Sequence, residues 1–141
     1  MELIKTVSII GANGTMGRNI AAIFASFGNA EVYLISRSIE KSGKAKESAY
    51  HSVRAESVKN RMIPADYGQL EECVKKSDLI FEACAEEWVI KEKIHRMISE
   101  SLNDLPLDIA LNKAVCSGTS GLSITRLAKI YDESLRSNVI G

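Results

Sequence analysis

The sequence lacks the cysteine and histidine patterns that mark several classes of protein. The three cysteines, Cys73, Cys84 and Cys116, are widely spaced, which is typical of small buried residues in a reducing compartment rather than of a disulfide framework. The two histidines, His51 and His95, form no cluster with them at metal-ligand spacing. The sequence therefore predicts neither a disulfide scaffold nor a metal site.

The sequence also lacks an excess of charge and a long apolar run. Lys and Arg number 18, and Asp and Glu number 18, so no basic surface for nucleic acid is predicted. No apolar run approaches the ~18–20 residues that span a bilayer, and the N-terminus has no signal-peptide layout. We therefore expect a cytoplasmic protein with neither a nucleic-acid nor a membrane partner.

What the sequence does have is the composition of a packed domain. Apolar residues make up 45% of the 141 residues, which is enough for one hydrophobic core. No internal repeat, linker or low-complexity tract divides the sequence. Residues 1–141 are therefore predicted to form a single domain.

A glycine string near the N-terminus is the most informative feature. Gly11-Ala12-Asn13-Gly14-Thr15-Met16-Gly17 directly follows the apolar run Val7–Ile10 and opens an amphipathic stretch. A strand, a glycine turn and a helix in this order form a dinucleotide cradle, in which the pyrophosphate lies at the helix N-terminus. A glycine-rich turn without a ligand is the alternative. The predicted cofactor-binding residues of the string are Gly11, Asn13, Gly14, Thr15, Met16 and Gly17.

Strand and helix patterns alternate along the rest of the sequence. This alternation predicts an α/β fold, a Rossmann-type doubly wound parallel sheet of about six strands with helices on both faces. The predicted strands cover residues 3–10, 31–35, 62–66, 78–83, 105–111 and 138–140. The first predicted helix runs from the glycine string to about Phe27, and the others cover 38–49, 70–76, 86–101 and 124–135. Residues 50–61 are assigned to no element.

Two of the predicted helices show an apolar face at helical spacing. The face of the first helix is formed by Met16, Ile20, Ile23, Phe24 and Phe27. The inward face of the helix over 86–101 is formed by Ile90, Ile94, Met97 and Ile98.

The residues that end the second strand distinguish NAD from NADP. In this fold an acid ~20 residues past the glycines bonds the ribose hydroxyl of NAD and repels the 2′-phosphate of NADP. Here that place is held by Ser36, followed by Arg37 and Ser38, with Lys41 one turn later. Two hydroxyls and a guanidinium suit a phosphate, so NADP is predicted to bind in preference to NAD. The alternative is that Arg37 is a solvated loop residue and that NAD binds weakly.

A cofactor that lies across the carboxyl ends of the strands also meets the loops that follow the later strands. That edge is predicted to collect Ser36, residues 83–86 and the loop near Ser120, in addition to the glycine string. Ala85 and Glu86 are therefore added to the predicted cofactor-binding residues.

Three blocks of sequence carry a family resemblance. They are Gly14-Thr15-Met16-Gly17-Arg18-Asn19-Ile20-Ala21, then Ser77-Asp78-Leu79-Ile80-Phe81-Glu82-Ala83 with Glu86 and Lys91, and finally Gly118-Thr119-Ser120-Gly121-Leu122-Ser123-Ile124-Thr125-Arg126-Leu127-Ala128. Together they resemble the N-terminal NAD-binding domain of 3-hydroxyacyl-CoA dehydrogenases. Many nucleotide-binding folds share the first block, whereas the other two are more specific in their spacing.

The resemblance implies a hydride transfer between a nicotinamide and a 3-hydroxy or 3-keto substrate, with acyl-CoA of fatty acid metabolism as the family's substrate. It implies that Glu86 and Lys91 lie near the ribose and nicotinamide of the cofactor. It also gives Ser120 a catalytic role, holding the substrate oxygen while a histidine, oriented by a glutamate, exchanges the proton. From the residues alone, Glu86 and Lys91 are better interpreted as capping or surface charges, and Ser120 is equally compatible with an ordinary loop residue.

Four features depart from the family pattern. Asn13 adds one residue between the first two glycines, giving a spacing common among NADP-binding modules, and Asn tolerates the left-handed conformation that such a turn uses. Ser36 stands where the family has an acid, and Gly118 stands where it usually has Asn. The helical insertion that contacts coenzyme A is shortened between Ser38 and Arg61. These departures favour smaller NADP-linked relatives over enzymes acting on acyl-CoA.

The proton-transfer residues of the family have no counterpart in the sequence. The matching histidine would follow within a few residues of Gly141, His51 lies in a polar stretch, and His95 is predicted at the surface or rim of a helix. We therefore expect the chain to bind its cofactor without turning over substrate, as part of a longer enzyme or as a natural single-domain protein. The alternative is a non-catalytic NADP-binding sensor or binding subunit. A domain of this kind exposes apolar surface, so a homodimer is also expected.

Overall fold

A parallel sheet forms the centre of the computed structural model, which describes residues 4–27, 29–53 and 56–141. Within these residues the sheet has six strands in the order β3-β2-β1-β4-β5-β6. The strands are β1 (Thr6–Ile10), β2 (Glu31–Ser36), β3 (Met62–Asp66), β4 (Leu79–Glu82), β5 (Ala114–Ser117) and β6 (Val139–Ile140). The strand order reverses between β1 and β4, which confirms the predicted doubly wound fold.

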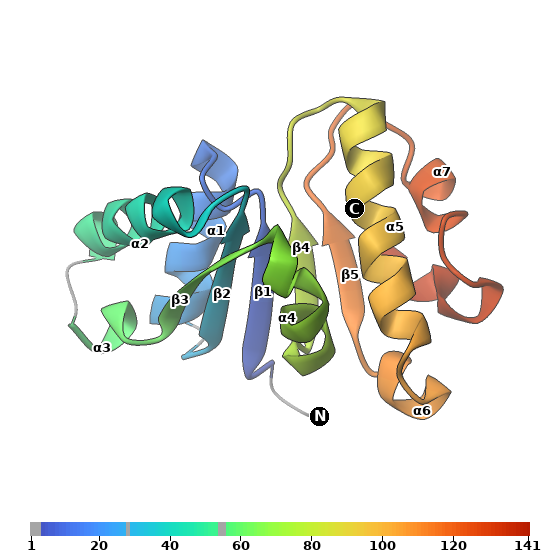
Figure 1. Ribbon diagram of the computed structural model, residues 1–141, viewed down its shortest axis with the longest axis horizontal. Coiled ribbons are helices and arrows are strands. Elements are labelled where there is room, and N and C mark those ends of the chain that lie inside the picture. The colour runs from blue at the N-terminus through green and yellow to red at the C-terminus, as the bar shows by residue number, and fades with distance from the viewer. Residues whose placement is uncertain (1–3, 28, 54–55) are drawn as a thin grey trace.

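Helices cover both faces of this sheet (Figure 1). On one face lie α1 (Thr15–Ser26), α2 (Ile39–Val53) and α3 (Glu56–Lys59). On the other face lie α4 (Leu70–Lys76) and α5 (Trp88–Asn103). Successive residues of β1 therefore enter different cores, with Ile9 packed on the α1 side and Ile10 on the α5 side.

The register of the strands aligns their carboxyl ends at one edge of the sheet. Ile10 lies opposite Ile35 on one side and Glu82 on the other, and Glu82 in turn lies opposite Ser117. The loops that leave these four strands therefore start at the same level, at the upper edge in Figure 1. This edge contains the glycine string, as predicted.

Helix α1 packs on the sheet through a face that differs from the predicted one. Its buried residues are small, namely Gly17, Ala21, Ala22 and Ala25, whereas Met16, Ile23 and Phe27 are 48%, 51% and 89% exposed. Ile20 and Phe24 are partly buried at the edge of this contact. Small side chains occupy the inner face because they let the helix lie close to β1. The apolar face predicted for α1 is therefore wrong for Met16, Ile23 and Phe27.

The predicted strand over 105–111 is also wrong. Its apolar residues alternate with others at a spacing of two, but Leu107–Ala110 form the short helix α6, and Leu107, Ile109 and Leu111 are exposed. Pro106 lacks the N–H that a strand would donate, and this donor is not needed before a helix. The fifth strand begins instead at Ala114, immediately after Lys113, whose Nζ donates to the carbonyl oxygens of Lys75 and Ser77.

The predicted helix over 124–135 is shorter in the structure. Helix α7 covers Ile124–Ala128 with Ser123 as its side-chain cap, as predicted, and a 3₁₀ segment, η2, covers Glu133–Asn138. The chain turns between them because Tyr131 enters the core on the α5 side.

The remaining predicted elements are confirmed with shifts of a few residues at their ends, and the predicted start of the first strand at residue 3 lies outside the described residues. β3 and α4 match their predicted ranges, and a short 3₁₀ turn, η1 (Tyr67–Gln69), joins them. Residues 50–53 extend α2, and 56–59 form α3, where no element was predicted. No helix in the described parts of the chain is long and apolar enough to cross a membrane.

Candidate functional site

A cleft of about 600 Å³ lies at the edge where the strand order reverses. This volume is within the usual range for small-molecule sites. The predicted site residues that line it are Gly11, Asn13, Gly14, Thr15, Met16, Arg37, Ala85, Glu86, Lys91 and Ser120. Gly17, Ser36 and Ser38, also predicted there, are not among the lining residues. The structure thus brings together residues from four separate parts of the sequence.

The three glycines of the string meet different constraints. Gly11 has a φ of +82°, and a Cβ on it would lie 2.7 Å from the Ala83 carbonyl oxygen. A Cβ on Gly17 would lie 2.6 Å from the Gly11 carbonyl oxygen, so this glycine permits the close contact of α1 with β1. A Cβ on Gly14 would meet the Gly11 oxygen at 3.5 Å, an ordinary contact, and its φ of −81° suits any residue. Neither packing nor the backbone therefore requires glycine at position 14.

The left-handed conformation of this turn belongs to Gly11. We expected Asn13 to be suited to such a conformation, but Asn29 is the non-glycine residue with positive φ in the described chain. Because Gly11 makes the turn, Asn13 keeps an ordinary backbone and lines the cleft.

The N-terminus of α1 faces the cleft with free backbone donors. Gly14 is its N-cap residue, and within the described residues no side chain caps this end and no acid lies in the first turn. The amides of the first turn have no partner within the helix, and the macrodipole adds partial positive charge. Thr15 and Met16 line the cleft at this point, so the helix N-terminus can bind an anion there.

Two cations lie in the cleft beyond the end of β2. Arg37 follows this strand, and Lys41 lies in the first turns of α2, and both line the cleft. The Ser36 hydroxyl is instead buried, where it contacts the Ser42 hydroxyl at 2.7 Å and donates to the Ser38 carbonyl oxygen. The Ser38 hydroxyl accepts from the Lys41 amide and caps α2. A cofactor contact by these two serines stays a prediction.

Glu86 ties the two later loops of the cleft together. Its carboxylate accepts hydrogen bonds from the Thr119 hydroxyl, from the Ser120 amide at 2.9 Å and from the Ser120 hydroxyl at 3.2 Å. The Thr119 hydroxyl and the Ser120 amide hold the pKa of this carboxyl below its usual value. Glu86 lies two residues before α5 rather than in its first turn, and it holds the Ser120 loop at the cleft.

Lys91 forms part of the cleft wall although its side chain is almost wholly buried. Its Nζ donates to Glu82 Oε2 at 2.6 Å and to the Cys84 carbonyl oxygen at 3.2 Å, and it lies 3.9 Å from Glu86 Oε1. Glu82 also accepts from the Ser117 hydroxyl and from the Cys84 amide, each at 2.7 Å. Burial raises the pKa of Glu82, but the donors His95, Lys91 and Ser117 outweigh burial and lower it to about 2.

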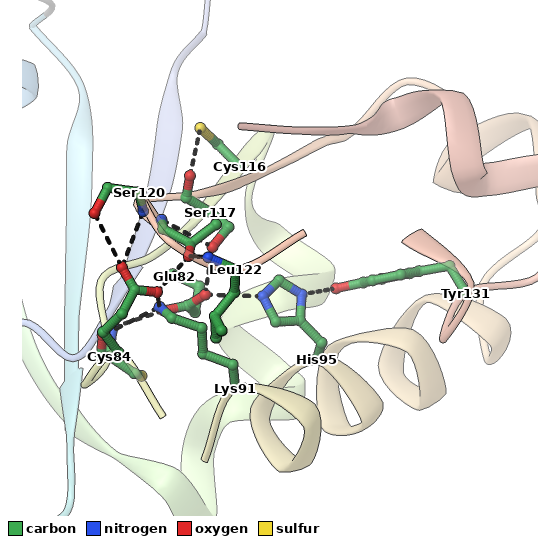
Figure 2. A network of polar contacts seen from close by, with 11 residues as sticks. Glu82, Cys84, Lys91, His95, Cys116, Ser117, Ser120, Leu122 and Tyr131 are labelled. Carbon is green, nitrogen blue, oxygen red and sulfur yellow. Dashed lines mark hydrogen bonds and ion pairs between the residues drawn. The ribbon is translucent and has the colours of Figure 1, made fainter. Parts of the chain in front are cut away.

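His95 lies in the core. The prediction that it lies at the surface or rim of its helix is wrong. Its ring is fully buried between Glu82 and Tyr131, at 2.9 Å from Glu82 Oε1 and 2.7 Å from the Tyr131 hydroxyl (Figure 2). Because both ring nitrogens have partners, the ring satisfies its hydrogen-bonding groups without water.

The thiols of Cys84, in the cleft, and of Cys73, in α4, are protonated at neutral pH. Cys84 lines the cleft, and burial raises the pKa of its thiol to about 12, while burial raises that of Cys73 to about 11. Cys73, Cys84 and Cys116 are all free, but only Cys73 is buried, so the predicted burial of all three is wrong for the other two. A protonated thiol is a poor nucleophile.

Sequence reasoning missed several residues of the site. Tyr131 has no motif of its own. Glu82 lies in the second resemblance block but was given no role, and its pairing with His95 joins two separate elements, β4 and α5. Gly118 also lines the cleft, where a Cβ on it would lie 2.5 Å from Met16 Sδ and 3.3 Å from the Phe81 ring. Other missed residues that line the cleft are Tyr67 and Ile90, whereas Ala83 belongs to the stretch 83–86 that was predicted there.

Comparisons with known proteins agree with this geometry. The sequence matches the family model "3-hydroxyacyl-CoA dehydrogenase, NAD binding domain" over residues 6–141. No curated protein matches it significantly.

Solved structures share the fold. FadB2 from M. tuberculosis has a TM-score of 0.77 and 19% identity, covering 98% of this chain and 48% of that one. FHMPC 5-dehydrogenase, described as an NAD⁺-dependent dismutase, has a TM-score of 0.72 and 24% identity, covering 95% of this chain and 43% of that one. Quinate dehydrogenase from Corynebacterium glutamicum, solved with NAD, has a TM-score of 0.68 and 13% identity, covering 96% and 43%. This chain therefore spans about half the length of these proteins.

The family model covers both the glycine string at the start of the cleft and the Ser120 loop that closes it. The chain belongs to the family of 3-hydroxyacyl-CoA dehydrogenase NAD-binding domains.

Proposed function

We propose that this chain binds a nicotinamide dinucleotide in the cleft, as the cofactor half of an oxidoreductase that moves hydride between the nicotinamide and a 3-hydroxy or 3-keto substrate. The observation that carries the proposal is Gly14, where the protein leaves room for a side chain and yet has none. The open side of this glycine lies in the cleft, beside uncapped amides of α1. A ligand backbone pressed against position 14 explains its identity.

The residues of this chain have distinct roles in the proposal. The amides at the start of α1 bind the pyrophosphate, and the bound nicotinamide supplies the site that accepts or donates hydride. Lys91 and Glu86 shape the other end of the cleft, and Ser120 orients the substrate oxygen through its hydroxyl. Small 3-hydroxy or 3-keto acids and acyl-CoA thioesters are the substrate classes that we propose.

We further propose that NADP is preferred to NAD. Two cations, Arg37 and Lys41, line the cleft just past the end of β2. Glu40 is a nearby acid, but it pairs with Lys44 at 3.4 Å and is not a lining residue. A guanidinium and an ammonium at this place favour the 2′-phosphate of NADP.

A second candidate is a non-catalytic NADP-binding sensor or binding subunit. His95 lies in the core and His51 lies on α2, so neither of these two histidines faces the cleft for proton transfer. Under either candidate function, the purified chain is expected to bind NADP. Measurable turnover of 3-hydroxyacyl-CoA by the purified chain would favour the enzyme and reject the second candidate.

Thermal unfolding tests the cofactor assignment. A ligand that binds the native state raises the melting temperature by mass action, so NADP is expected to raise it more than NAD does. At a nucleotide concentration about 100 times Kd the stabilisation is about 2.7 kcal/mol. Equal shifts with the two nucleotides would reject the NADP preference, and no shift with either would reject the cleft as a dinucleotide site.

The variant Arg37→Asp tests the phosphate contact itself. It is expected to weaken NADP binding at least about tenfold, equivalent to about 1.4 kcal/mol, and to leave NAD binding within about threefold. Lys44→Asp is the matched control, because it makes the same change of charge on an exposed face of α2 outside the cleft. Titration with each nucleotide measures the affinities. If the affinities for NADP and NAD fall by the same factor, Arg37 does not bind the 2′-phosphate.

A further inference from the structure

We propose that His95 and Tyr131 are positioning residues of the cleft, which act by fixing the orientation of the buried Glu82 carboxylate. Glu82 in turn fixes the Lys91 ammonium in the cleft wall and Ser117 beside the Ser120 loop. This inference rests on the proposed function, because the position of Lys91 matters through the dinucleotide that the cleft binds.

The contacts form one continuous chain from the core to the cleft (Figure 2). The Tyr131 hydroxyl lies 2.7 Å from His95 Nδ1, and His95 Nε2 lies 2.9 Å from Glu82 Oε1. Glu82 Oε2 accepts from Lys91 Nζ at 2.6 Å, and Lys91 lines the cleft. Glu82 ends β4, Lys91 and His95 lie on α5, and Tyr131 lies in the turn after α7. The contacts therefore join three separate parts of the fold.

In the neutral ring of His95, the hydrogen bonds select one tautomer. The carboxylate of Glu82 accepts, so Nε2 carries the proton that it donates. Nδ1 is then the acceptor for the Tyr131 hydroxyl, whose proton is retained because burial raises the pKa of Tyr131 well above its usual value. Each donor is used once, and the ring is held at both ends.

The same arrangement fills every acceptor site of Glu82. Oε1 accepts from His95 and from the Ser117 hydroxyl, and Oε2 accepts from Lys91 and from the Cys84 amide. Four donors in fixed directions leave this carboxylate a single orientation. Without the His95 donor, Oε1 would keep only the Ser117 hydroxyl, so the carboxylate and the Lys91 ammonium bound to Oε2 would be held less firmly in one orientation.

Two other buried residues of α5 near His95 are apolar. Ile94 and Ile98 are also buried on this helix and pack in an apolar cluster. A His and a Tyr hydroxyl are costly to bury compared with aliphatic residues of similar size, unless they are paired as here. The network thus has a consequence for Glu82 and the cleft that aliphatic packing would lack.

Affinity measurements on three variants test the proposal. His95→Leu removes both hydrogen bonds and keeps a similar volume, so it is expected to weaken NADP binding about tenfold. His95→Gln offers an amide N–H to Glu82 and an oxygen to Tyr131, so it is expected to restore affinity to within about threefold. Tyr131→Phe releases Nδ1 and is expected to cause a smaller loss. Energy transfer from Trp88, the single tryptophan, to the reduced nicotinamide measures binding.

Ser101→Ala is the matched control. Ser101 is also buried on α5, but its hydroxyl donates to the Met97 carbonyl oxygen and lies outside the network. This variant is expected to lower stability without changing NADP affinity. If His95→Leu and the wild-type chain bind NADP equally, the positioning role is wrong while the proposed function stands. If the wild-type chain binds neither nucleotide, the proposed function is wrong, and so is the positioning role of His95 and Tyr131.

A spectroscopic measurement on the wild-type chain keeps the test independent of the folding of any variant. Nitrogen-15 shifts of the imidazoles are expected to show His95 with its proton on Nε2, and these shifts are expected to move when NADP is added. His51, on α2, provides an internal comparison within the same spectrum. A His95 ring protonated on Nδ1 alone, or one whose resonances ignore NADP that binds, would overturn the inference.

Discussion

Gly14 differs from its neighbours in the glycine string because its environment within the protein would accept a side chain. Its substitution by alanine therefore separates ligand binding from folding. Gly14→Ala places a Cβ 3.5 Å from the Gly11 oxygen, an ordinary contact, so the free energy of unfolding is expected to change by no more than about 1 kcal/mol. The same methyl group projects where the pyrophosphate would approach, so dinucleotide affinity is expected to fall at least about tenfold.

Urea unfolding and a nucleotide titration on the same preparation check this pair of effects. Gly121→Ala serves as the control, since its Cβ has open space around it in the described structure. Unchanged nucleotide affinity in Gly14→Ala would show that the ligand does not approach this residue. A large loss of stability would instead show that the protein itself requires the glycine.

Single residues also show where sequence reasoning succeeded and where it failed. The glycines, Arg37, Glu86 and Ser120 were predicted at the site because each follows a strand end, and parallel strands bring their carboxyl ends together. His95 was misplaced because a polar residue in the middle of a helix suggests solvent. Its burial depends on Glu82 and Tyr131, which lie 13 and 36 residues away and have no local pattern.

At the scale of elements, the close packing of α1 on β1 depends on the small residues of the helix. Gly17→Ala would place a Cβ 2.6 Å from the Gly11 oxygen and 2.8 Å from the Ala12 Cα, both backbone atoms that cannot move aside. The helix would have to move away from the sheet. We expect the free energy of unfolding to fall by about 2 kcal/mol or more, as for other overpacked cores.

Gly43→Ala is the matched control for this prediction. Gly43 lies within α2, and a Cβ on it would have no neighbour within 4 Å among the described residues. Because alanine favours the helix, this variant is expected to stabilise the chain by about 0.5–1 kcal/mol. Chemical denaturation measures both variants. Similar stability changes of the same sign would contradict the packing argument.

The predicted elements held where burial and periodicity agreed. The strands β1, β2 and β4 are buried on both faces, and their apolar runs predict them directly. The error at 105–111 has a physical cause. Four apolar residues at a spacing of two resemble a strand, but the position beside β4 in the sheet is already occupied. That position is taken by Ala114–Ser117, a shorter run with fewer large residues.

At the scale of the whole molecule, the buried Glu82 network links stability to pH. The pKa of Glu82 is lowered from 4.5 to about 2 in the folded chain, because its hydrogen-bond donors outweigh the effect of burial. A carboxyl whose folded pKa is lowered stabilises the fold above its ordinary pKa. This stabilisation is lost as the pH falls from about 4.5 towards about 2, by up to about 1.4 kcal/mol per pH unit.

Other carboxyls add to the acid sensitivity of the chain, and salt separates their contributions. The pKa values of Glu72, Glu86 and Glu92 are also lowered, each mainly by a side-chain hydrogen bond, but these groups lie at the surface. Added salt screens interactions at the surface much more than those of a buried pair. The acid-dependent loss that persists at about 1 M salt is therefore expected to come chiefly from the Glu82 network.

Glu82→Gln is the variant that isolates this contribution. It is expected to be less stable than the wild-type chain at neutral pH, by about 3–5 kcal/mol, because it leaves the Lys91 ammonium buried without its counter-charge. Its unfolding free energy should then decline less steeply between about pH 4.5 and about pH 2, because the titrating group is gone. The carbon-13 shift of the Glu82 carboxyl in the wild-type chain gives the same information without a variant. A carboxyl that titrates near its ordinary pKa would show that the donors around it do not hold it ionised, and that the network does not make the fold more stable above this pKa.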